Sequence, residues 1–178
     1  MSYHHHIITG GPGAGKTTLI EALERAGYGR TVEAGRAVIQ AQVATGGTAL
    51  PWIDPSAFAA LMIEHELRSY REAAGGAGAM FFDRGLPDIV GYLKLSGRPV
   101  PLSLDSLCRT HRYNVRVFIA PPWPEIYAQD AERKQSFEEA VRTYDVMVAT
   151  YPAYGYELIE LPRASVAERV RFMLAHLA

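Results

Sequence analysis

A glycine-rich segment near the start of the chain, residues 10–18, contains the residue types that hold phosphate. It reads GGPGAGKTT and satisfies the P-loop pattern Gly10-x-x-x-x-Gly15-Lys16-Thr17. Glycines let the backbone turn so that amide N–H groups approach phosphate oxygens, the lysine reaches the β- and γ-phosphates, and the threonine hydroxyl is a ligand for Mg²⁺. The segment predicts a site for ATP and Mg²⁺ made by Gly10, Gly11, Pro12, Gly13, Ala14, Gly15, Lys16, Thr17 and Thr18.

A second segment with residues suited to catalysis is FFDRGLPD, in which Asp83 and Arg84 follow an apolar run. A strand of this kind delivers Asp83 to the carboxyl edge of a parallel sheet, where ligands bind in α/β proteins. A carboxylate there can hold Mg²⁺ opposite Thr17. The Arg84 guanidinium can stabilise the negative charge on a phosphoryl group in transfer. The pair therefore indicates phosphoryl-transfer chemistry.

Other polar and aromatic side chains lie in predicted loops. Trp52 and Trp123 are flanked by prolines, and each can either stack on a flat ring or anchor its loop. Asp54 and Asp88 can bind a sugar hydroxyl, although Asp54 before Pro55 is also typical of a helix N-cap. In the segment LPRAS after the last predicted strand, Arg163 can contact either an adenine or a guanine base. We expect Trp52, Asp54, Asp88 and Trp123 to bind substrate, and Arg163 to bind the nucleotide.

Short apolar runs alternate with longer amphipathic segments along the chain. Strands are expected at about 5–9, 30–33, 79–83, 115–120 and 156–161, and helices at about 16–26, 34–45 and 55–74. Two further helices begin at the capping boxes of Ser136 with Glu139 and Ser165 with Glu168. The pattern predicts a three-layer P-loop NTPase fold, with a five-stranded parallel sheet covered by helices on both faces. Residues 1–178 are expected to form one domain, with a lid segment at about 123–135.

The composition is that of an ordinary globular protein, with 48% apolar and 21% charged residues and a formal net charge of -1. No basic surplus points to nucleic acid or an anionic membrane surface, and no apolar run is long enough to span a bilayer. The single cysteine, Cys108, excludes an internal disulfide and is expected in the core. With no signal peptide visible, we expect a cytoplasmic enzyme; no feature points to an oligomeric state.

Three consecutive histidines, His4 to His6, run directly into the first predicted strand. They can be a tag remnant, a metal cluster or the native start of the strand. The native start is favoured, since alternate residues of a strand face opposite ways and do not converge on one ion.

Taken in order, the segments GGPGAGKTT, VEAGRAVI, PWIDPSAF, FFDRGLPD and PPWPEIYAQDAERKQSFEEA resemble a known family of proteins. It is the family of bacterial AAA-type ATPases and predicted kinases related to the nicotinamide riboside kinase domain of NadR. Deoxynucleoside and thymidylate kinases are more distant relatives. P-loop kinases of small molecules commonly carry Asp-Arg or Glu-Arg where Asp83 and Arg84 stand. Switch GTPases carry Asp-x-x-Gly and Asn-Lys-x-Asp instead, which this sequence lacks.

The resemblance implies roles for residues that spacing alone does not explain. Glu33 matches the acid that faces the acceptor hydroxyl as general base. Arg36 completes the Glu-x-x-Arg of the NadR-like proteins and is expected to bind substrate. Asp83 is the other candidate base, and a helix N-terminal acid is the other interpretation of Glu33. Arg133, with Lys134 second to it, matches the lid arginines that close over the phosphates.

The prediction is therefore an ATP- and Mg²⁺-dependent kinase of a small hydroxylated, nucleoside-like metabolite. Its catalytic residues would be Lys16, Glu33, Asp83, Arg84 and Arg133, and its metal ligands Thr17 and Asp83. Two alternatives stay open: a regulatory module that binds ATP or GTP without an acceptor, and an ATPase that transfers the phosphoryl group to water.

Overall fold

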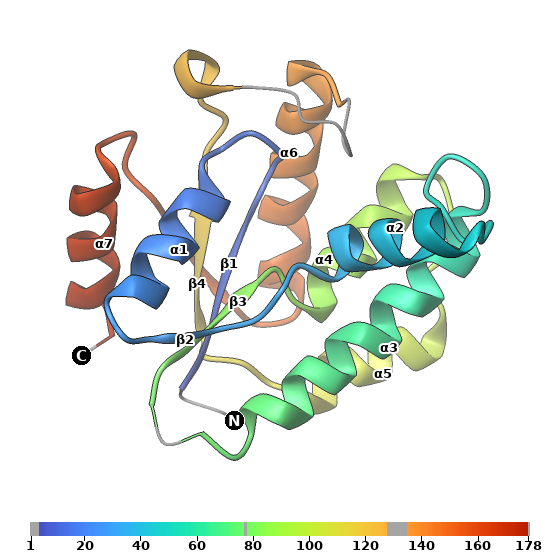
Figure 1. Ribbon diagram of the computed structural model, residues 1–178, viewed down its shortest axis with the longest axis horizontal. Coiled ribbons are helices and arrows are strands. Elements are labelled where there is room, and N and C mark those ends of the chain that lie inside the picture. The colour runs from blue at the N-terminus through green and yellow to red at the C-terminus, as the bar shows by residue number, and fades with distance from the viewer. Residues whose placement is uncertain (1–3, 77, 128–134, 178) are drawn as a thin grey trace.

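The computed structural model of the chain describes residues 4–76, 78–127 and 135–177. Strands and helices alternate along it (Figure 1). In chain order the elements are β1 (His5–Gly10), α1 (Lys16–Arg25), β2 (Gly29–Arg30), α2 (Ala34–Thr45), α3 (Pro55–Ala73), β3 (Met80–Asp83), α4 (Leu86–Leu95), α5 (Leu102–Thr110), β4 (Arg116–Ala120), the short 3-10 helix η1 (Pro124–Ile126), α6 (Phe137–Ala153), β5 (Glu157–Glu160) and α7 (Val166–Ala175).

The five strands form one parallel sheet in the order β2-β3-β1-β4-β5. The central strand β1 pairs with β3 on one side and β4 on the other, with Ile8 in register with both Asp83 and Phe118. The strands that follow β1 in sequence therefore lie on both sides of it, and the strand order reverses next to β1. Ligands of open α/β sheets bind at such a switch point, beyond the carboxyl ends of the strands. In this protein the segment beyond β1 is the P-loop.

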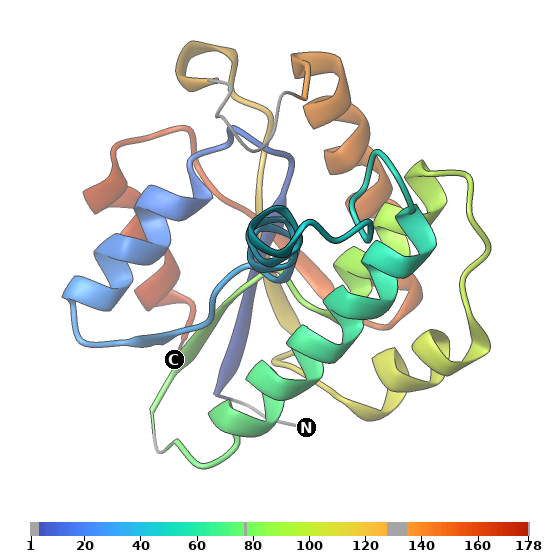
Figure 2. The ribbon, with the colours of Figure 1, turned by 45° about the vertical axis from the view of Figure 1, so that its right-hand side comes forward.

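Helices cover both faces of the sheet, as the sequence predicted. Helices α1 and α7 lie on one face, and α3, α4 and α6 lie on the other (Figures 1 and 2). Helix α2 packs on α3, and α5 packs on α4. Apolar side chains fill both interfaces: Leu19 and Phe118 between the sheet and α1 with α7, and Phe82 and Met147 between the sheet and α6. The three-layer architecture is confirmed.

The structure corrects three details of the sequence prediction. The strand expected at 30–33 is only Gly29–Arg30; Thr31 still donates to the Phe81 carbonyl, and the chain then leaves the sheet to begin α2. Helix α4 was not predicted. The sequence pattern predicts that Ala37, Val38, Ala41 and Ala44 form the apolar face of α2. The buried residues are instead Ala34, Gly35, Val38 and Ile39.

Several local predictions hold. Asp54 caps α3 by accepting hydrogen bonds from Ser56 N and Ala57 N, and both capping boxes form at α6 and α7. Cys108 is fully buried, and burial raises the pKa of its thiol to about 12, which keeps it protonated. His5 and His6 are buried within β1 beside different aromatic rings, as native strand residues are. Among the described residues no helix is long and apolar enough to cross a membrane.

Gly10, the last residue of β1, is required by both conformation and space. Its φ is +128°, and a Cβ atom there would lie 2.4 Å from the Ala120 carbonyl oxygen. That oxygen belongs to the backbone of β4 and cannot move aside without disturbing the sheet. Gly46, which ends α2 at φ +68°, has open space around the same position.

We expect Gly10→Ala to lower the free energy of unfolding by about 3 kcal/mol or more, since it adds overpacking to backbone strain. Gly46→Ala is the matched control and should cost about 1 kcal/mol, from the left-handed backbone alone. Chemical denaturation measures both values. Equal losses for the two variants would contradict the close approach of β1 and β4.

Candidate active site

The P-loop joins β1 to α1 and is built on left-handed glycines. Gly13 has φ +70°, and Gly15, at φ +77°, is the residue from which α1 begins. The first amide groups of a helix lack partners within it, so its N-terminus attracts anions. The buried Lys16 ammonium donates to the Gly11 carbonyl at 2.6 Å. Lysine, glycine turns and helix N-terminus are thus brought together as the motif predicted.

A buried arginine of the last helix, Arg169 of α7, holds the P-loop by hydrogen bonds to its backbone. Both terminal nitrogens of its guanidinium donate to the Ala14 carbonyl, each at 3.3 Å. The guanidinium carbon also lies 5.7 Å from the centre of the Trp123 ring, a cation–π distance. Sequence reasoning missed Arg169. The signal available was its spacing, because Arg169 and Met173 form the buried stripe of α7 at i and i+4.

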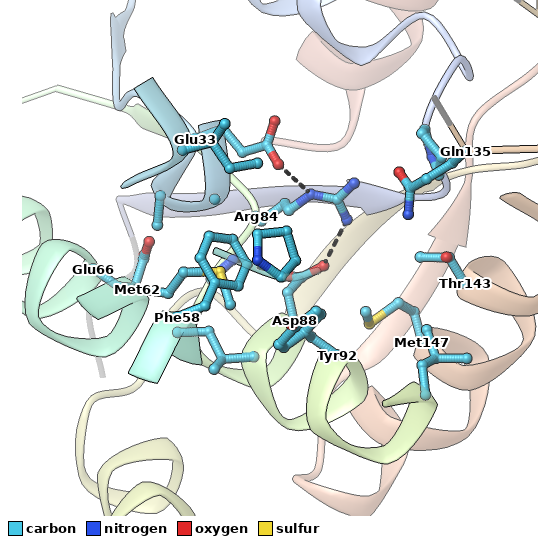
Figure 3. A pocket seen from close by; sticks show the side chains of 18 of the residues that line it. Glu33, Phe58, Met62, Glu66, Arg84, Asp88, Tyr92, Gln135, Thr143 and Met147 are labelled. Carbon is cyan, nitrogen blue, oxygen red and sulfur yellow. Dashed lines mark hydrogen bonds and ion pairs between the residues drawn. The ribbon is translucent and has the colours of Figure 1, made fainter. Parts of the chain in front are cut away.

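Arg84, directly after β3, has the one positive φ observed among the described non-glycine residues, +72°. This conformation turns its side chain back toward the P-loop. Its Nε donates to Glu33 Oε1 at 3.0 Å, and its Nη1 donates to Asp88 Oδ1 at 3.2 Å (Figure 3). Its Nη1 also donates to the Gly10 carbonyl at 2.9 Å. A strained backbone held by several bonds is typical of a functional position. Arg84 therefore links the ends of β1 and β3 with the starts of α2 and α4.

The charges around Arg84 favour its ionised state. Burial lowers its pKa, but the carboxylates of Glu33, Asp88 and Asp83 outweigh this effect and raise the pKa above its ordinary value. The guanidinium thus remains a fixed positive charge at every accessible pH. It stands beside the backbone of Gly10, at the entrance to the P-loop.

Asp88 is a buried anchor of the site. One oxygen accepts hydrogen bonds from the Thr9 hydroxyl and Arg84, and the other accepts from the Gly85 amide and the Tyr151 hydroxyl. A carboxylate can accept about four hydrogen bonds, and these four donors use that capacity. The structure therefore makes Asp88 a positioning residue for Arg84, and its contact with a substrate hydroxyl stays a prediction.

A cavity of about 330 Å³ opens beside Arg84, within the size range of small-molecule sites. Arg84 lies in the middle of the labelled side chains, with Met62 and Glu66 to one side and Thr143 and Met147 to the other (Figure 3). Pro12 of the P-loop contributes to the wall. The polar lining residues are Glu33, Glu66, Arg84, Asp88, Gln135, Glu139 and Thr143. The other lining residues are Ala34, Gly35, Ile39, Pro51, Trp52, Phe58, Met62, Gly85, Ile89, Tyr92, Leu95 and Met147.

The cavity separates the predicted substrate residues into two groups. Trp52 and Asp88 line it, together with Glu33 and Arg84. Asp54, Trp123 and Arg36 do not: Asp54 is exposed and caps α3, and Trp123 lies beside Arg169 behind the P-loop. Their contact with a substrate stays a prediction.

Arg163 was expected to contact the nucleotide base, and the lid residues Arg133 and Lys134 were expected to contact the phosphates. Arg163 is exposed, and its Nε donates to the Pro122 carbonyl at 3.0 Å, so it joins the loops that follow β4 and β5. Its contact with a nucleotide base stays a prediction. Arg133 and Lys134, and most of the expected lid at 123–135, lie outside the described residues.

The two expected metal ligands come from neighbouring elements. Thr17 is exposed in the first turn of α1, and Asp83 is buried at the end of β3, beside β1. The Asp83 amide donates to the Thr31 hydroxyl at 3.3 Å, which fixes its backbone. A hydroxyl and a carboxylate are hard oxygen donors that suit Mg²⁺, which usually takes its remaining ligands from phosphates and water. Within the described ranges, no group of three or more acidic, histidine or cysteine side chains is arranged so that it could hold a metal ion by itself.

Glu66 of α3 is a site residue that sequence reasoning missed. It is 2% exposed, and its Oε1 accepts a hydrogen bond from the Tyr113 hydroxyl at 3.1 Å. Burial raises its pKa; the Tyr113 hydrogen bond lowers it, and the charges of Asp88 and Asp83 raise it, to about 8. The signal in the sequence is again spacing, because Phe58, Met62 and Glu66 follow one another at i, i+4 and i+8 on the buried face of α3.

Together, the glycine turns, the buried lysine and the arginine at the switch point define a P-loop domain. A sequence profile of the AAA domain matches residues 5–169, and the chain belongs to this family of AAA domains. The family resemblance expected from the sequence is therefore confirmed. No curated protein matches the sequence significantly.

Two proteins of known structure, a deoxyadenosine kinase and NadR, share this fold. Deoxyadenosine kinase from M. mycoides is 14% identical, with 97% of this chain and 98% of the kinase aligned; the TM-score is 0.69 for the structure with the products dCMP and dCDP and 0.59 for the one with dATP. The NadR protein in complex with NR is 18% identical, with a TM-score of 0.69 over 96% of this chain. This chain spans about half of NadR, 49% of its length. These likenesses show that the fold is shared.

The raised pKa of Glu66 predicts a pH-dependent stability. In the unfolded chain its carboxyl ionises near pH 4.5, and in the folded protein near pH 8. Between these values the folded state binds more protons, so its stability is full below pH 4.5 and falls as the pH rises to about 8. Glu66→Gln removes this loss, by at most about 1.4 kcal/mol for each pH unit.

Denaturation of wild type and Glu66→Gln across this pH range measures the effect, with the exposed Glu64→Gln as the control on the same helix. We expect the advantage of Glu66→Gln over wild type to grow with pH, and Glu64→Gln to follow wild type. A constant difference between Glu66→Gln and wild type would contradict the raised pKa.

Proposed function

We propose that this protein transfers the terminal phosphoryl group of ATP, with Mg²⁺, to a hydroxyl of a small nucleoside-like metabolite bound in the cavity. The observation that carries the proposal is that Pro12 of the P-loop lines the same cavity as the ion pair of Glu33 and Arg84. A phosphate on the P-loop and a hydroxyl in the cavity would then meet at Arg84. The names of the similar structures, deoxyadenosine kinase and NadR with NR, support an acceptor of this kind.

In the proposed reaction the acceptor oxygen forms a bond to the γ-phosphorus, and the bond from this phosphorus to the β–γ bridging oxygen breaks. The proton of the hydroxyl passes to the Glu33 carboxylate, and ADP leaves. Glu33 is suited to this role because it lines the cavity and its Oε1 already accepts from Arg84. A general base must lie within hydrogen-bond reach of the proton that it takes.

Lys16 and Arg84 would stabilise the charge of the transferred group. Both are cations held by the protein backbone, Lys16 by the Gly11 carbonyl and Arg84 by the Gly10 carbonyl. Fixed positive charges cost little reorganisation when negative charge develops, which is why positioning and electrostatics carry most of phosphoryl transfer.

Thr17 and Asp83 would hold Mg²⁺ together with phosphate oxygens of ATP. The bound ion neutralises phosphate charge and orients the β- and γ-phosphates. Asp83 is the second candidate for the base. We favour Glu33, because Glu33 lines the cavity and Asp83 does not.

A panel of nucleosides and related hydroxylated metabolites with ATP and Mg²⁺ tests the proposal. We expect at least one acceptor to accelerate ADP release above the rate without acceptor. If no acceptor does so, the kinase proposal fails. Hydrolysis that is fast without acceptor would favour an ATPase, and tight nucleotide binding with neither reaction would favour a regulatory module.

The Glu33→Gln variant distinguishes the base from a structural acid. We expect it to lower acceptor-dependent turnover by about 100-fold or more, the usual contribution of a general base. ADP release without acceptor should stay unchanged. The exposed Glu21→Gln, on α1, is the control and should behave as wild type. Loss of acceptor-independent hydrolysis instead would assign Glu33 to water activation and contradict the proposal.

Arg84→Met should lower kcat by about 100-fold or more with any acceptor that the panel identifies, since it removes a fixed charge at the transferred group. Arg109→Met removes an arginine whose partner, Asp105, lies on the surface of α5, and should leave kcat unchanged. Steady-state kinetics and a melting curve for each variant separate catalysis from folding. A folded Arg84→Met protein with wild-type kcat would remove Arg84 from the mechanism.

A further inference from the structure

The end of the cavity at α3 is apolar except for the carboxyl group of Glu66 and the hydroxyl group of Tyr92. Phe58 and Met62 lie on the same face of α3 as Glu66, and Ile89 of α4 also lines this region of the site. Phe58 packs edge-on against Tyr92, with ring centres 5.3 Å apart. A flat apolar group would be well enclosed by these side chains. Glu66 is the acid in this apolar wall, and it is buried.

The hydrogen bonds of Glu66 leave part of its capacity unused. Its Oε1 accepts from the Tyr113 hydroxyl, and Tyr113 in turn accepts from the Leu86 amide at 3.4 Å. In the part of the chain that the structure describes, the bond from Tyr113 is the one hydrogen bond found to the Glu66 carboxyl. Burying a polar group without partners is costly, so a carboxyl in a cavity wall points to a partner inside the cavity.

We propose that Glu66 determines the specificity of this site by hydrogen-bonding an uncharged planar group that carries a donor beside an acceptor. A carboxamide, a lactam and an amidine edge all have this arrangement. The inference rests on the proposed function, since it takes the cavity as the acceptor site. It adds to that function the chemical class of the group that lies opposite the reacting hydroxyl.

The protonation state of Glu66 explains the preference for an uncharged partner. Groups that face it are the Tyr113 hydroxyl and the carboxylates of Asp88 and Asp83, and burial with these charges raises its pKa to about 8. At neutral pH the carboxyl is therefore mostly protonated. A neutral carboxyl donates one hydrogen bond and accepts others, so it matches a donor–acceptor edge with two parallel bonds. An ionised carboxylate would select a cation instead.

Calorimetric binding of four nucleosides, in the presence of Mg²⁺ and a non-hydrolysable ATP analogue, tests the inference. Adenosine, inosine and cytidine carry a donor beside an acceptor; purine riboside keeps its ring acceptors but lacks the donor. We expect at least one of the first three to bind about 10-fold or more tightly than purine riboside, the usual effect of a buried hydrogen bond left unmade.

Variants of Glu66 assign the preference to this residue. Glu66→Gln keeps both a donor and an acceptor and should retain the preference, whereas Glu66→Met should reduce it to less than about 3-fold. Glu64→Met, on the exposed face of α3, should bind as wild type. A melting curve checks that each variant is folded, and Glu66→Gln tests the inference even if Glu66→Met is not.

Four results would overturn the inference. Either no nucleoside binds, or purine riboside binds as tightly as the others. Alternatively, a folded Glu66→Met protein keeps the wild-type preference, or a folded Glu66→Gln protein loses it. Preferential binding without ADP release contradicts the proposed kinase activity and leaves the role of Glu66 supported. ADP release without the preference supports the kinase activity and contradicts the role of Glu66.

Discussion

The site depends on the position of one guanidinium group, that of Arg84. Its backbone is in a left-handed conformation, and three bonds hold its side chain to Gly10, Glu33 and Asp88. These partners come from the end of β1 and the starts of α2 and α4, which are distant in sequence and meet only at the switch point of the sheet. A positive charge in this place stabilises several backbone and carboxylate oxygens at once, which offsets the strain at its own backbone.

The contacts around Arg84 explain how the fold positions the rest of the site. Asp88 fixes Arg84 and is itself fixed by Thr9, Gly85 and Tyr151, so α6 is connected to β1 through the same carboxylate. On the other side of the sheet, Arg169 of α7 holds the Ala14 carbonyl of the P-loop. Helices from both faces therefore define where a phosphate and a second ligand would meet.

The sequence was sufficient to predict those parts of the structure that depend on a local pattern of residues. The P-loop, the capping boxes and the alternation of apolar strands with amphipathic helices depend on neighbouring residues, and the structure has them as predicted. It was insufficient for side chains whose partners are remote. Trp123 has a ring suited to stacking on a substrate, and in the folded chain it lies at a cation–π distance from Arg169 of α7. Glu66 and Arg169 carry no motif, and their only sign is a charge within an apolar helical stripe.

The central claim is that the P-loop and the cavity form one reaction site, so that the phosphoryl group goes to an organic hydroxyl. Labelling the γ-phosphate of ATP and separating the products tests it most directly. With nucleosides present, we predict that the label appears in a phosphate ester of a nucleoside and that Glu33→Gln suppresses this product. Label found in inorganic phosphate alone, at a rate that no nucleoside changes, would contradict the account.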